Sequence, residues 1–499
     1  MLISGFVSIF TVKIICLIFG GVVLGIVLGA IPGITVTMSV ALFLPVTFGM
    51  DPLEAICLLV ALYIGGTSGG LISAILLKIP GTPASIATTF DGHPMAMRGD
   101  AGKALGVGIV FSFFGGMISY IILMFLAPTL ARVTLEFGPY EYFSIALFSL
   151  TMIAGMSGKS LVKGCISALL GIMFAFVGMA PITGFPRFTF GVDELSDGFS
   201  LLSALIGLFA VSQILDDAGK SKVEESTTAF EYNINGFGFT WKEFVSQKWN
   251  MLISAAIGTG IGILPGLGGG ICNFVAYSAV QKCSKYPEKF GTGVIDGIVA
   301  SESSNNACTG GAMIPLLTLG IPGDNTTAMI LAGFTIHGII PGPLLFDMHG
   351  ELVYGIFAAL IVANIFMLAA EFWGMRAFVR ILSIPKNILI PVVGVMCIIG
   401  GYGANNRVFD IWTMLVFGII GLLMKRLAVP IAPIILGFIL CPILETNFRR
   451  GLQKSNGSLA PFFTEPISCA FIIITLLVLA YMTYGIYKKG AAARTLVSE

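Results

Sequence analysis

The sequence predicts an all-α polytopic membrane protein with about twelve membrane segments in two homologous repeats. The chain is 56% hydrophobic and only 11% charged, with a mean hydropathy of +0.96, whereas a soluble domain is about one quarter charged. Apolar segments of bilayer-spanning length, about 20 residues, recur throughout the chain. Two helix-breaking motifs occur twice, in the same order. We expect inverted repeats with broken helices or re-entrant hairpins.

The composition excludes several other classes of protein. A formal net charge of +1 argues against nucleic acid as a partner. The nine cysteines form no Cys-x-x-Cys pair, and the three histidines lack metal-ligand spacing, so we expect neither disulfides nor a metal site. The apolar N-terminus is typical of a first span rather than of a removable signal. No long soluble domain is predicted, so a separate chain would have to capture any extracytoplasmic substrate.

The duplicated motifs define the two repeats. One motif reads Gly-Gly, an apolar run containing Leu-Leu, and Ile-Pro-Gly; it places Pro80 and Pro322 at an offset of 322 − 80 = 242 residues. The other, Gly-x-x-x-Gly-x-x-Pro-Gly, occupies 25–33 and 258–266, at an offset of 265 − 32 = 233. Two motifs at similar offsets indicate an internal duplication in which each half contributes one wall of a site.

The first repeat, residues 1–215, begins with an apolar run at 6–31 that a Pro-Gly pair interrupts. A break at membrane depth frees backbone groups that lipid cannot satisfy, so it must be buried in protein or line a wet cavity. For this copy alone, a simple kink or turn between spans is an equally weighted alternative. The next run, 55–77, holds Thr67 and Ser68 between glycines, where close helix packing is the alternative to a binding role.

The chain breaks again at 80–85, Pro-Gly-Thr-Pro-Ala-Ser, because two prolines around Gly-Thr cannot sit in a regular helix. For Asp91, which follows, a role in a turn beside Gly92 is favoured over a role as an ion ligand. Residues 216–250 are the polar linker between the repeats. Further apolar segments of the first repeat lie at about 104–127, 140–155, 161–180 and 199–215.

The second repeat, residues 251–499, follows the same plan. Its first apolar run, 251–271, is broken at Gly266, and the stretch 301–327 combines a carboxylate, two adjacent amides and an Ile-Pro-Gly break. The basic tail indicates a cytoplasmic C-terminus. Five more apolar segments lie at about 352–372, 377–401, 408–424, 428–444 and 468–487.

Broken helices suit the binding of an anion together with a cation. Free N–H groups at a half-helix N-terminus favour carboxylates, and free C=O groups favour a cation such as sodium. Glu302 could serve proton or sodium coupling, or could be a structural carboxylate that caps the Asn-Asn turn. For Lys78, snorkelling to the membrane interface is favoured over attraction of the anion.

We therefore predict a substrate- and ion-binding site from both repeats, with Na⁺ or H⁺ as the coupling ion and no cofactor. Catalytic and nucleotide-binding motifs such as His-Glu-x-x-His and the P-loop are absent from the sequence, so no enzyme activity is expected. An intramembrane enzyme that uses Glu302 and nearby hydroxyls is the alternative. The predicted site residues are Gly33, Thr35, Thr67, Ser68, Pro80, Gly81, Thr82, Ser85, Gly266, Glu302, Ser303, Asn305, Asn306, Pro322, Gly323, Asn325, Thr326 and Thr327.

These motifs resemble the large membrane subunit, TctA, of the tripartite tricarboxylate transporter family. The resemblance covers nearly the whole chain and departs from the family pattern at Ser301 and Ser304, where Pro and Ala are expected. The motifs that carry it are Gly29-x-x-Pro-Gly-Ile, the block 63–83, Thr89-Phe-Asp-Gly-x-Pro, Pro265-Gly266, Glu302-Ser-x-Asn-Asn-Ala, Gly310-Gly311, the run 315–323 and His337-Gly-x-x-Pro-Gly-Pro.

The resemblance implies a multi-pass secondary transporter of the bacterial inner membrane. It would import carboxylates, citrate-like tricarboxylates or related acids, driven by a sodium or proton gradient. Its implied partners are a small four-span membrane subunit and a periplasmic solute-binding protein that delivers the substrate.

Overall fold

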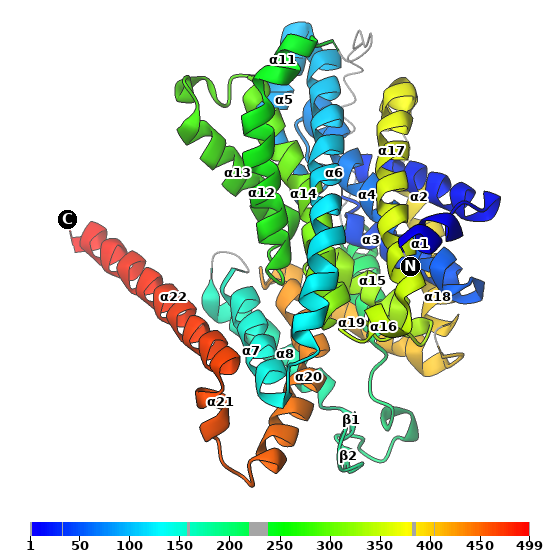
Figure 1. Ribbon diagram of the computed structural model, residues 1–499, viewed down its shortest axis with the longest axis vertical. Coiled ribbons are helices and arrows are strands. Elements are labelled where there is room, and N and C mark those ends of the chain that lie inside the picture. Colours follow the sequence, from blue (N-terminus) through cyan, green and yellow to red (C-terminus); the bar gives the residue numbers. More distant parts are fainter. Residues whose placement is uncertain are drawn as a thin grey trace.

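The computed structural model describes residues 2–31, 33–156, 160–218, 238–381, 386–403 and 405–498. These residues are almost entirely helical (Figure 1), as the sequence predicts. Pro32 of the first break and residues 219–237 of the expected linker lie outside the described residues.

The helices of the first half are α1 (Leu2–Ser8), α2 (Val12–Ala30), α3 (Val36–Phe43), α4 (Pro52–Leu77), α5 (Thr88–Met95), α6 (Ala101–Thr134), α7 (Pro139–Met156), α8 (Leu161–Ala175), α9 (Leu201–Ile206) and α10 (Ser212–Ala218). Short 3₁₀ or π turns between them are η1 (Leu44–Gly49), η2 (Pro83–Ser85), η3 (Ala96–Asp100), η4 (Asp193–Leu195) and η5 (Gly207–Val211).

The second half contains α11 (Trp241–Ser246), α12 (Lys248–Ile263), α13 (Gly268–Cys283), η6 (Pro287–Lys289), α14 (Ile295–Leu319), α15 (Asn325–Ile336), α16 (Leu345–Met348), α17 (Gly350–Ile381), α18 (Lys386–Gly403), α19 (Val408–Arg426), α20 (Ala432–Lys454), α21 (Ala460–Thr464) and α22 (Pro466–Ser498). The end of the expected linker is therefore helical.

Seven helices of the described ranges are long and apolar enough to cross a membrane, which supports a polytopic membrane protein. Shorter apolar helices such as 36–49, 201–216 and 325–336 lie among them. The seven candidate spans are Val12–Ala30, Pro52–Leu77, Thr88–Thr134, Gly350–Met375, Val408–Arg426, Ala432–Lys454 and Pro466–Tyr484.

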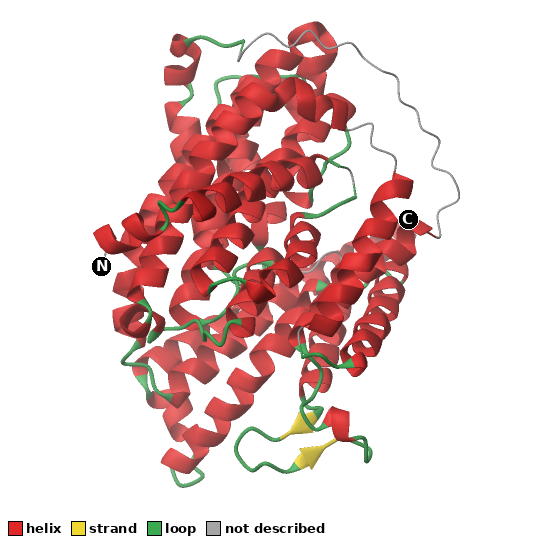
Figure 2. Ribbon diagram, turned by 90° about the vertical axis from the view of Figure 1, so that its right-hand side faces the viewer, coloured by secondary structure: helices red, strands yellow, loops and turns green. Residues whose placement is uncertain are grey.

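One small β-hairpin departs from the all-helical expectation. Strands β1 (Gly178–Met179) and β2 (Pro186–Arg187) pair antiparallel at one end of the molecule (Figure 2). Arg187 forms an ion pair of 2.8 Å with Glu445 of α20, which fixes the hairpin to the helices. The prediction of an apolar segment at 161–180 thus runs past the end of α8 at Ala175.

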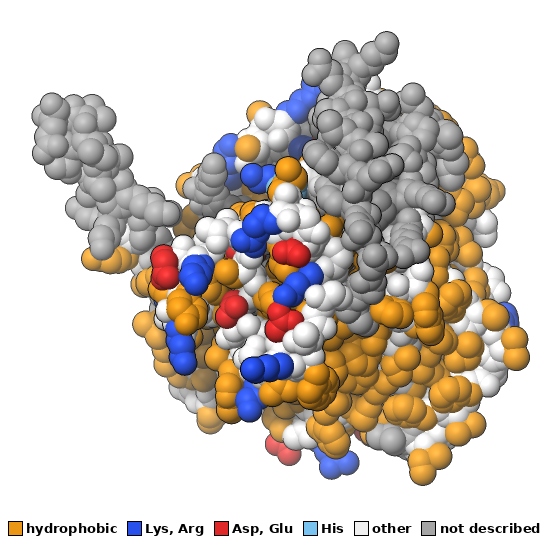
Figure 3. Space-filling model, turned by 90° about the horizontal axis from the view of Figure 1, so that it is seen from above, with side chains coloured by type: hydrophobic (Ala, Val, Ile, Leu, Met, Phe, Trp, Pro, Cys, Tyr) orange, Lys and Arg blue, Asp and Glu red, His pale blue; other side chains and the backbone are white. Residues whose placement is uncertain are grey.

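The opposite end of the molecule carries many charged side chains. Seen from above, Lys, Arg, Asp and Glu gather there while the flank is largely hydrophobic (Figure 3). At this end α11 is tied to α6 by a bond from Lys103 to Glu243. A charged end above an apolar flank is the distribution expected of a protein that crosses a bilayer.

Breaks occur at all four predicted places. Helix α2 ends at Ala30 and α3 begins at Val36; likewise α12 ends at Ile263 and α13 begins at Gly268. Helices α4 and α14 end in left-handed residues, Lys78 (φ 57°) and Gly320 (φ 70°). Lys78 is exposed, which fits the favoured snorkelling role.

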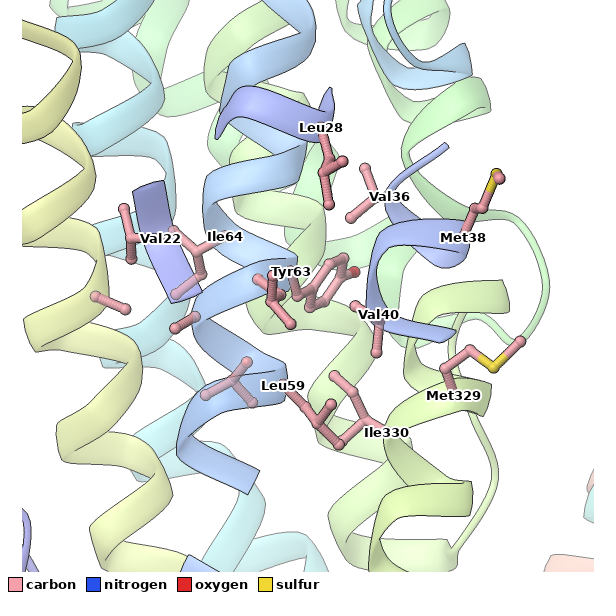
Figure 4. Close-up of a cluster of buried hydrophobic side chains, with 14 of the residues drawn as sticks. Val22, Leu28, Val36, Met38, Val40, Leu59, Tyr63, Ile64, Met329 and Ile330 are labelled. Carbon is pink, nitrogen blue, oxygen red and sulfur yellow. The ribbon is translucent and has the colours of Figure 1, made fainter. Parts of the chain in front are cut away.

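Each broken helix packs closely against its neighbour. Helix α2 lies along α4 and α12 lies along α14. Val36 and Val40 of α3 meet Leu59 and Tyr63 of α4 in an apolar cluster to which Ile330 of α15 also belongs (Figure 4). The two break-bearing pairs and α6 thus form one packed body, beside which α7, α8, α20 and α22 form a second group (Figure 1).

The breaks pack so tightly that only glycine fits. A Cβ on Gly81 would collide with the carbonyl oxygen of Gly29, and a Cβ on Gly323 would lie 2.6 Å from the carbonyl oxygen of Gly262. Both obstacles are backbone atoms that cannot swing aside.

We expect Gly81→Ala and Gly323→Ala each to destabilise the protein by about 1–3 kcal/mol, because the added methyl group overpacks a rigid site. Thermal unfolding of the purified protein in detergent would then show lower melting temperatures. Gly20→Ala on α2 is the control, since nothing lies within 4 Å of its Cβ position. Gly81→Ala and Gly323→Ala variants that melt at the temperature of the control would contradict the steric explanation.

Candidate functional site

The break cavity is a space of about 250 Å³ where the chain interruptions of both halves meet. Side chains of α4 and α14 form part of its wall, and the starts of α3, α13, α15 and η2 form the rest together with Phe209 of η5. Its lining residues are Thr35, Val36, Thr37, Tyr63, Thr67, Thr82, Pro83, Ala84, Phe209, Gly266, Leu267, Gly268, Gly269, Gly270, Asn305, Cys308, Thr309, Asp324, Asn325 and Thr326.

Three helices of eight residues or more begin at the break cavity. The side chain of Thr35 caps α3 by accepting from Met38 N at 3.2 Å. Asp324 caps α15 by accepting from Thr327 N at 2.7 Å, and Thr327 Oγ1 in turn accepts from Asp324 N at 2.9 Å. Helix α13 begins at Gly268. Helix N-termini carry partial positive charge and unpaired N–H groups, so their convergence favours an anion.

Two hydrogen bonds between side chains join the two halves at the cavity wall. The Tyr63 hydroxyl donates to Asp324 Oδ2 at 2.6 Å, and the hydroxyls of Thr37 and Thr326 lie 2.9 Å apart. Asp324 is the one carboxylate among the residues that line the cavity, and none of these residues is Lys, Arg or His. The Tyr63 hydroxyl and the N-terminus of α15 therefore stabilise its negative charge.

Several oxygens at the cavity have no hydrogen-bond partner. These are Thr82 Oγ1, Asn305 Oδ1 and Asn325 Oδ1. The Asn305 amide nitrogen lies 3.4 Å from the carbonyl oxygen of Thr67, which fixes the orientation of the amide group. Buried polar atoms are nearly always paired, so oxygens left free at a cavity are available to a ligand, an ion or water.

The structure brings seven of the predicted site residues to the break cavity. They are Thr35, Thr67, Thr82, Gly266, Asn305, Asn325 and Thr326. Gly33 lines a neighbouring cavity of about 610 Å³, which shares Thr35, Phe209 and Asn325 with the first.

A second group of predicted residues shapes the breaks without lining the cavity. Ser85 Oγ accepts from Thr82 N at 3.3 Å, and Thr327 holds the start of α15. Gly81 and Gly323 are the close-packed glycines described above, each preceded by Pro80 or Pro322.

A third group faces away from the cavity. Glu302 accepts from Thr88 and from Ser112 (3.0 Å), and Asn306 donates to Ser112 Oγ at 2.8 Å. Ser303 Oγ lies 3.3 Å from the carbonyl oxygen of Phe111, and Ser68 donates to Glu371 at 2.9 Å.

The expectation of a turn at Asn305 and Asn306 is wrong, because both lie inside the continuous helix α14. Glu302 therefore caps no turn. Asn305 and Asn306 are successive residues of a helix and point about 100° apart, so only Asn305 reaches the cavity.

Sequence reasoning missed Tyr63, Thr37, Thr309 and Asp324 as lining residues, although a signal for three of them was present. The repeat offset of 242 residues relates Tyr63 to the predicted Asn305, Thr309 to the predicted Thr67, and Asp324 to the predicted Thr82. Tyr63, Thr309 and Asp324 could therefore have been predicted by adding or subtracting 242 from the number of each predicted residue.

Asp91 has the structural role that the sequence favoured. Its carboxylate accepts from the Tyr277 hydroxyl at 2.7 Å and from the backbone N–H groups of Gly291, Gly293 and Val294 at 3.0, 2.7 and 2.9 Å. It thereby holds the loop that leads into α14.

Comparison with known proteins assigns the chain. Its sequence matches the tripartite tricarboxylate transporter TctA family over residues 15–436. An uncharacterised 52.8 kDa protein of the TAR-I ttuC' 3' region of Agrobacterium vitis is 35% identical over 458 residues, 92% of this chain and 91% of the relative. An uncharacterised protein of the TAR-II ttuC' 3' region of the same organism is 37% identical over 215 residues, 43% of this chain and 89% of the relative. No solved structure matches.

This family consists of transporters and not of enzymes, which sets aside the alternative of an intramembrane enzyme built on Glu302. The motifs, the apolar helices and the match over most of the sequence agree, and the chain belongs to the tripartite tricarboxylate transporter TctA family.

Proposed function

We propose that the chain is the large translocating subunit of a binding-protein-dependent secondary transporter that imports carboxylates, driven by a sodium or proton gradient. Citrate-like tricarboxylates and related acids are the substrate class. A small four-span membrane subunit and a periplasmic solute-binding protein are its partners, and the bacterial inner membrane is its location. Family membership supports the tripartite assembly.

The observation that carries the proposal is the convergence of the N-termini of α3, α13 and α15 on the break cavity. A carboxylate bound there would accept from backbone N–H groups and from threonine hydroxyls, while the free oxygens of Asn305 and Asn325 would accept from a substrate hydroxyl or contact the coupling cation. Such neutral donors bind an anion without a permanent ion pair, so the substrate can also leave. A transporter needs this balance, because it must release what it binds.

Matching contacts in the two halves support the proposed repeats. A Cβ on Gly69 of α4 would collide with the carbonyl oxygen of Ile26 of α2. At the corresponding offsets, a Cβ on Gly311 of α14 would collide with the carbonyl oxygen of Thr259 of α12. The walls of the cavity also correspond, since the start of α3 matches that of α13 and the start of η2 matches that of α15. We propose that the halves are inverted and alternate access to the cavity between them.

Uptake of labelled citrate and of a panel of di- and tricarboxylates tests the function. The complete three-component system is reconstituted in vesicles, with the binding protein outside and a sodium or a proton gradient imposed. Gradient-dependent accumulation of one of these acids is expected. No accumulation of any acid under either gradient would overturn the proposal.

We expect Asn305→Ala to weaken apparent substrate affinity by about 2- to 10-fold, because the free Asn305 Oδ1 can accept from a hydroxyl or a protonated carboxyl of the substrate, and such a hydrogen bond contributes about 0.5–1.5 kcal/mol. The measurement is the concentration dependence of uptake. Thr318→Val is the control, since this buried residue of the same helix donates only to Ile314 O (2.8 Å) and lies outside the cavity. An unchanged affinity in Asn305→Ala would remove this residue from the site.

Cysteine labelling tests the shared cavity and the alternating access. We expect Thr82→Cys and Thr326→Cys to react with a membrane-impermeant thiol reagent, and substrate to protect both, because both positions line one cavity. Thr464→Cys, at an exposed position of α21, should be labelled without protection. Labelling of Thr82→Cys and Thr326→Cys from one side only, under all conditions, would contradict an inverted arrangement.

A further inference from the structure

Two glutamates lie deep in the protein, behind the walls of the break cavity. Glu302 of α14 is 0% exposed and Glu371 of α17 is 1% exposed. Glu371 belongs to the candidate span Gly350–Met375, where the sequence predicted only an apolar segment. Burying a carboxylate away from water is unfavourable unless a cation or a proton compensates its charge, so two carboxylates at such depth in the protein indicate a function.

The partners of both carboxylates are neutral. Hydroxyl groups of Thr88 and Ser112 donate to Glu302, and the hydroxyl of Ser68 donates to Glu371 Oε2. The other oxygen of Glu371, Oε1, has no hydrogen-bond partner. None of the described ion pairs includes either glutamate.

Many charged groups of the neighbouring helices have partners other than the two glutamates. Near the ends of α2, α4, α5, α6 and α14, polar contacts join Lys13 with Glu54, Lys103 with Glu243, Asp296 with Gln247 and Asn250, Arg98 with Gly293 O, His93 with Ile75 O, and Asp91 with Tyr277. The tyrosines Tyr63 and Tyr120 bond to Asp324 and Thr309. Within the described contacts, no cation compensates Glu302 or Glu371.

We propose that Glu302 and Glu371 are a proton-binding pair that couples substrate transport to the proton gradient. This proposal rests on the transport function proposed above. A buried carboxylate without a cation is stabilised by binding a proton. The Oε1 atom of Glu371, which has no hydrogen-bond partner, can carry that proton. Each glutamate takes a proton from water on one side of the membrane and returns it to water on the other.

Both glutamates connect to the cavity wall through adjacent residues. Ser68, the partner of Glu371, follows Thr67, which lines the cavity. Ser112, a partner of Glu302, also accepts from Asn306, the neighbour of the cavity residue Asn305. A substrate that displaces α4 or α14 would therefore change the surroundings of both carboxylates, which is the physical requirement for coupling.

Infrared spectroscopy of the purified complete transporter tests proton occupancy without any need for transport. A protonated carboxyl group shows a C=O stretching band, which shifts in D₂O, whereas an ionised carboxylate lacks this band. We expect such bands at neutral pH, and expect Glu302→Gln and Glu371→Gln each to remove part of them. Glu351→Gln, at an exposed position of α17, should leave them unchanged. Identical bands in all three variants would overturn the proposal.

Transport in vesicles tests the coupling, with labelled citrate and the related acids of the panel as probes. We expect Glu302→Gln and Glu371→Gln to lose proton-driven accumulation at least 10-fold while substrate exchange across the membrane persists, and Glu351→Gln to behave as the parent. Glutamine preserves size and can still accept from Ser68, so the fold should be kept. Full accumulation in both variants, driven by sodium alone, would overturn proton coupling but not carboxylate transport. Absence of exchange in the parent would instead count against the proposed function.

Discussion

The backbone N–H and C=O groups that a helix break leaves unpaired at membrane depth need hydrogen-bond partners. The rest of this structure depends on which groups of the protein supply these partners. Lipid offers no hydrogen bonds, so the breaks must be buried against each other. Here the N–H of Gly266, in the break after α12, donates to the carbonyl oxygen of Gly323, in the break after α14, at 2.7 Å. Gly81 likewise lies against the carbonyl oxygen of Gly29. In each half, the backbone at a helix break therefore packs against the backbone of a neighbouring segment. Glycine is required at these contacts because a Cβ atom would collide with the opposing backbone.

The same constraint creates the site. Once the breaks are gathered in the protein interior, the helices that follow them must begin there, and their N-termini point into a common space. The polar side chains at this place are mainly hydroxyls and amides, which satisfy neighbouring backbone groups and still present atoms to a ligand. The burial of the helix breaks, which gives their backbone groups hydrogen-bond partners, thus also produces a site suited to an anion. The side chains that complete the cavity wall then determine which substrate binds.

The sequence was a good guide to the breaks and a poorer guide to the direction of side chains. Proline and glycine impose local conformation, so the ends of α2, α4, α12 and α14 could be predicted from the motifs alone. Whether Glu302 or Asn305 reaches the cavity depends on the rotation of α14 about its axis, which is set by packing against α6 and α4. An almost wholly buried helix has no amphipathic pattern that would reveal this rotation. The functional importance of Glu371 could not be predicted for a similar reason, since the residues around it form an ordinary apolar span.

The two halves of the cavity differ at one pair of positions, and this difference bears on how the site holds a ligand. Tyr63 and Asp324 bond to each other across the cavity. Their counterparts at the repeat offset are Asn305 and Thr82, whose Oδ1 and Oγ1 atoms have no partner. Of the two equivalent contacts between the repeats, one is therefore a hydrogen bond, and the other leaves free polar atoms in both repeats. If both contacts were hydrogen-bonded, these positions would offer a ligand no side-chain oxygen. If neither were, the half-buried carboxylate of Asp324 would lose the hydrogen bond from Tyr63. Divergence of the repeats at these positions thus stabilises the fold on one side and leaves polar atoms for binding on the other.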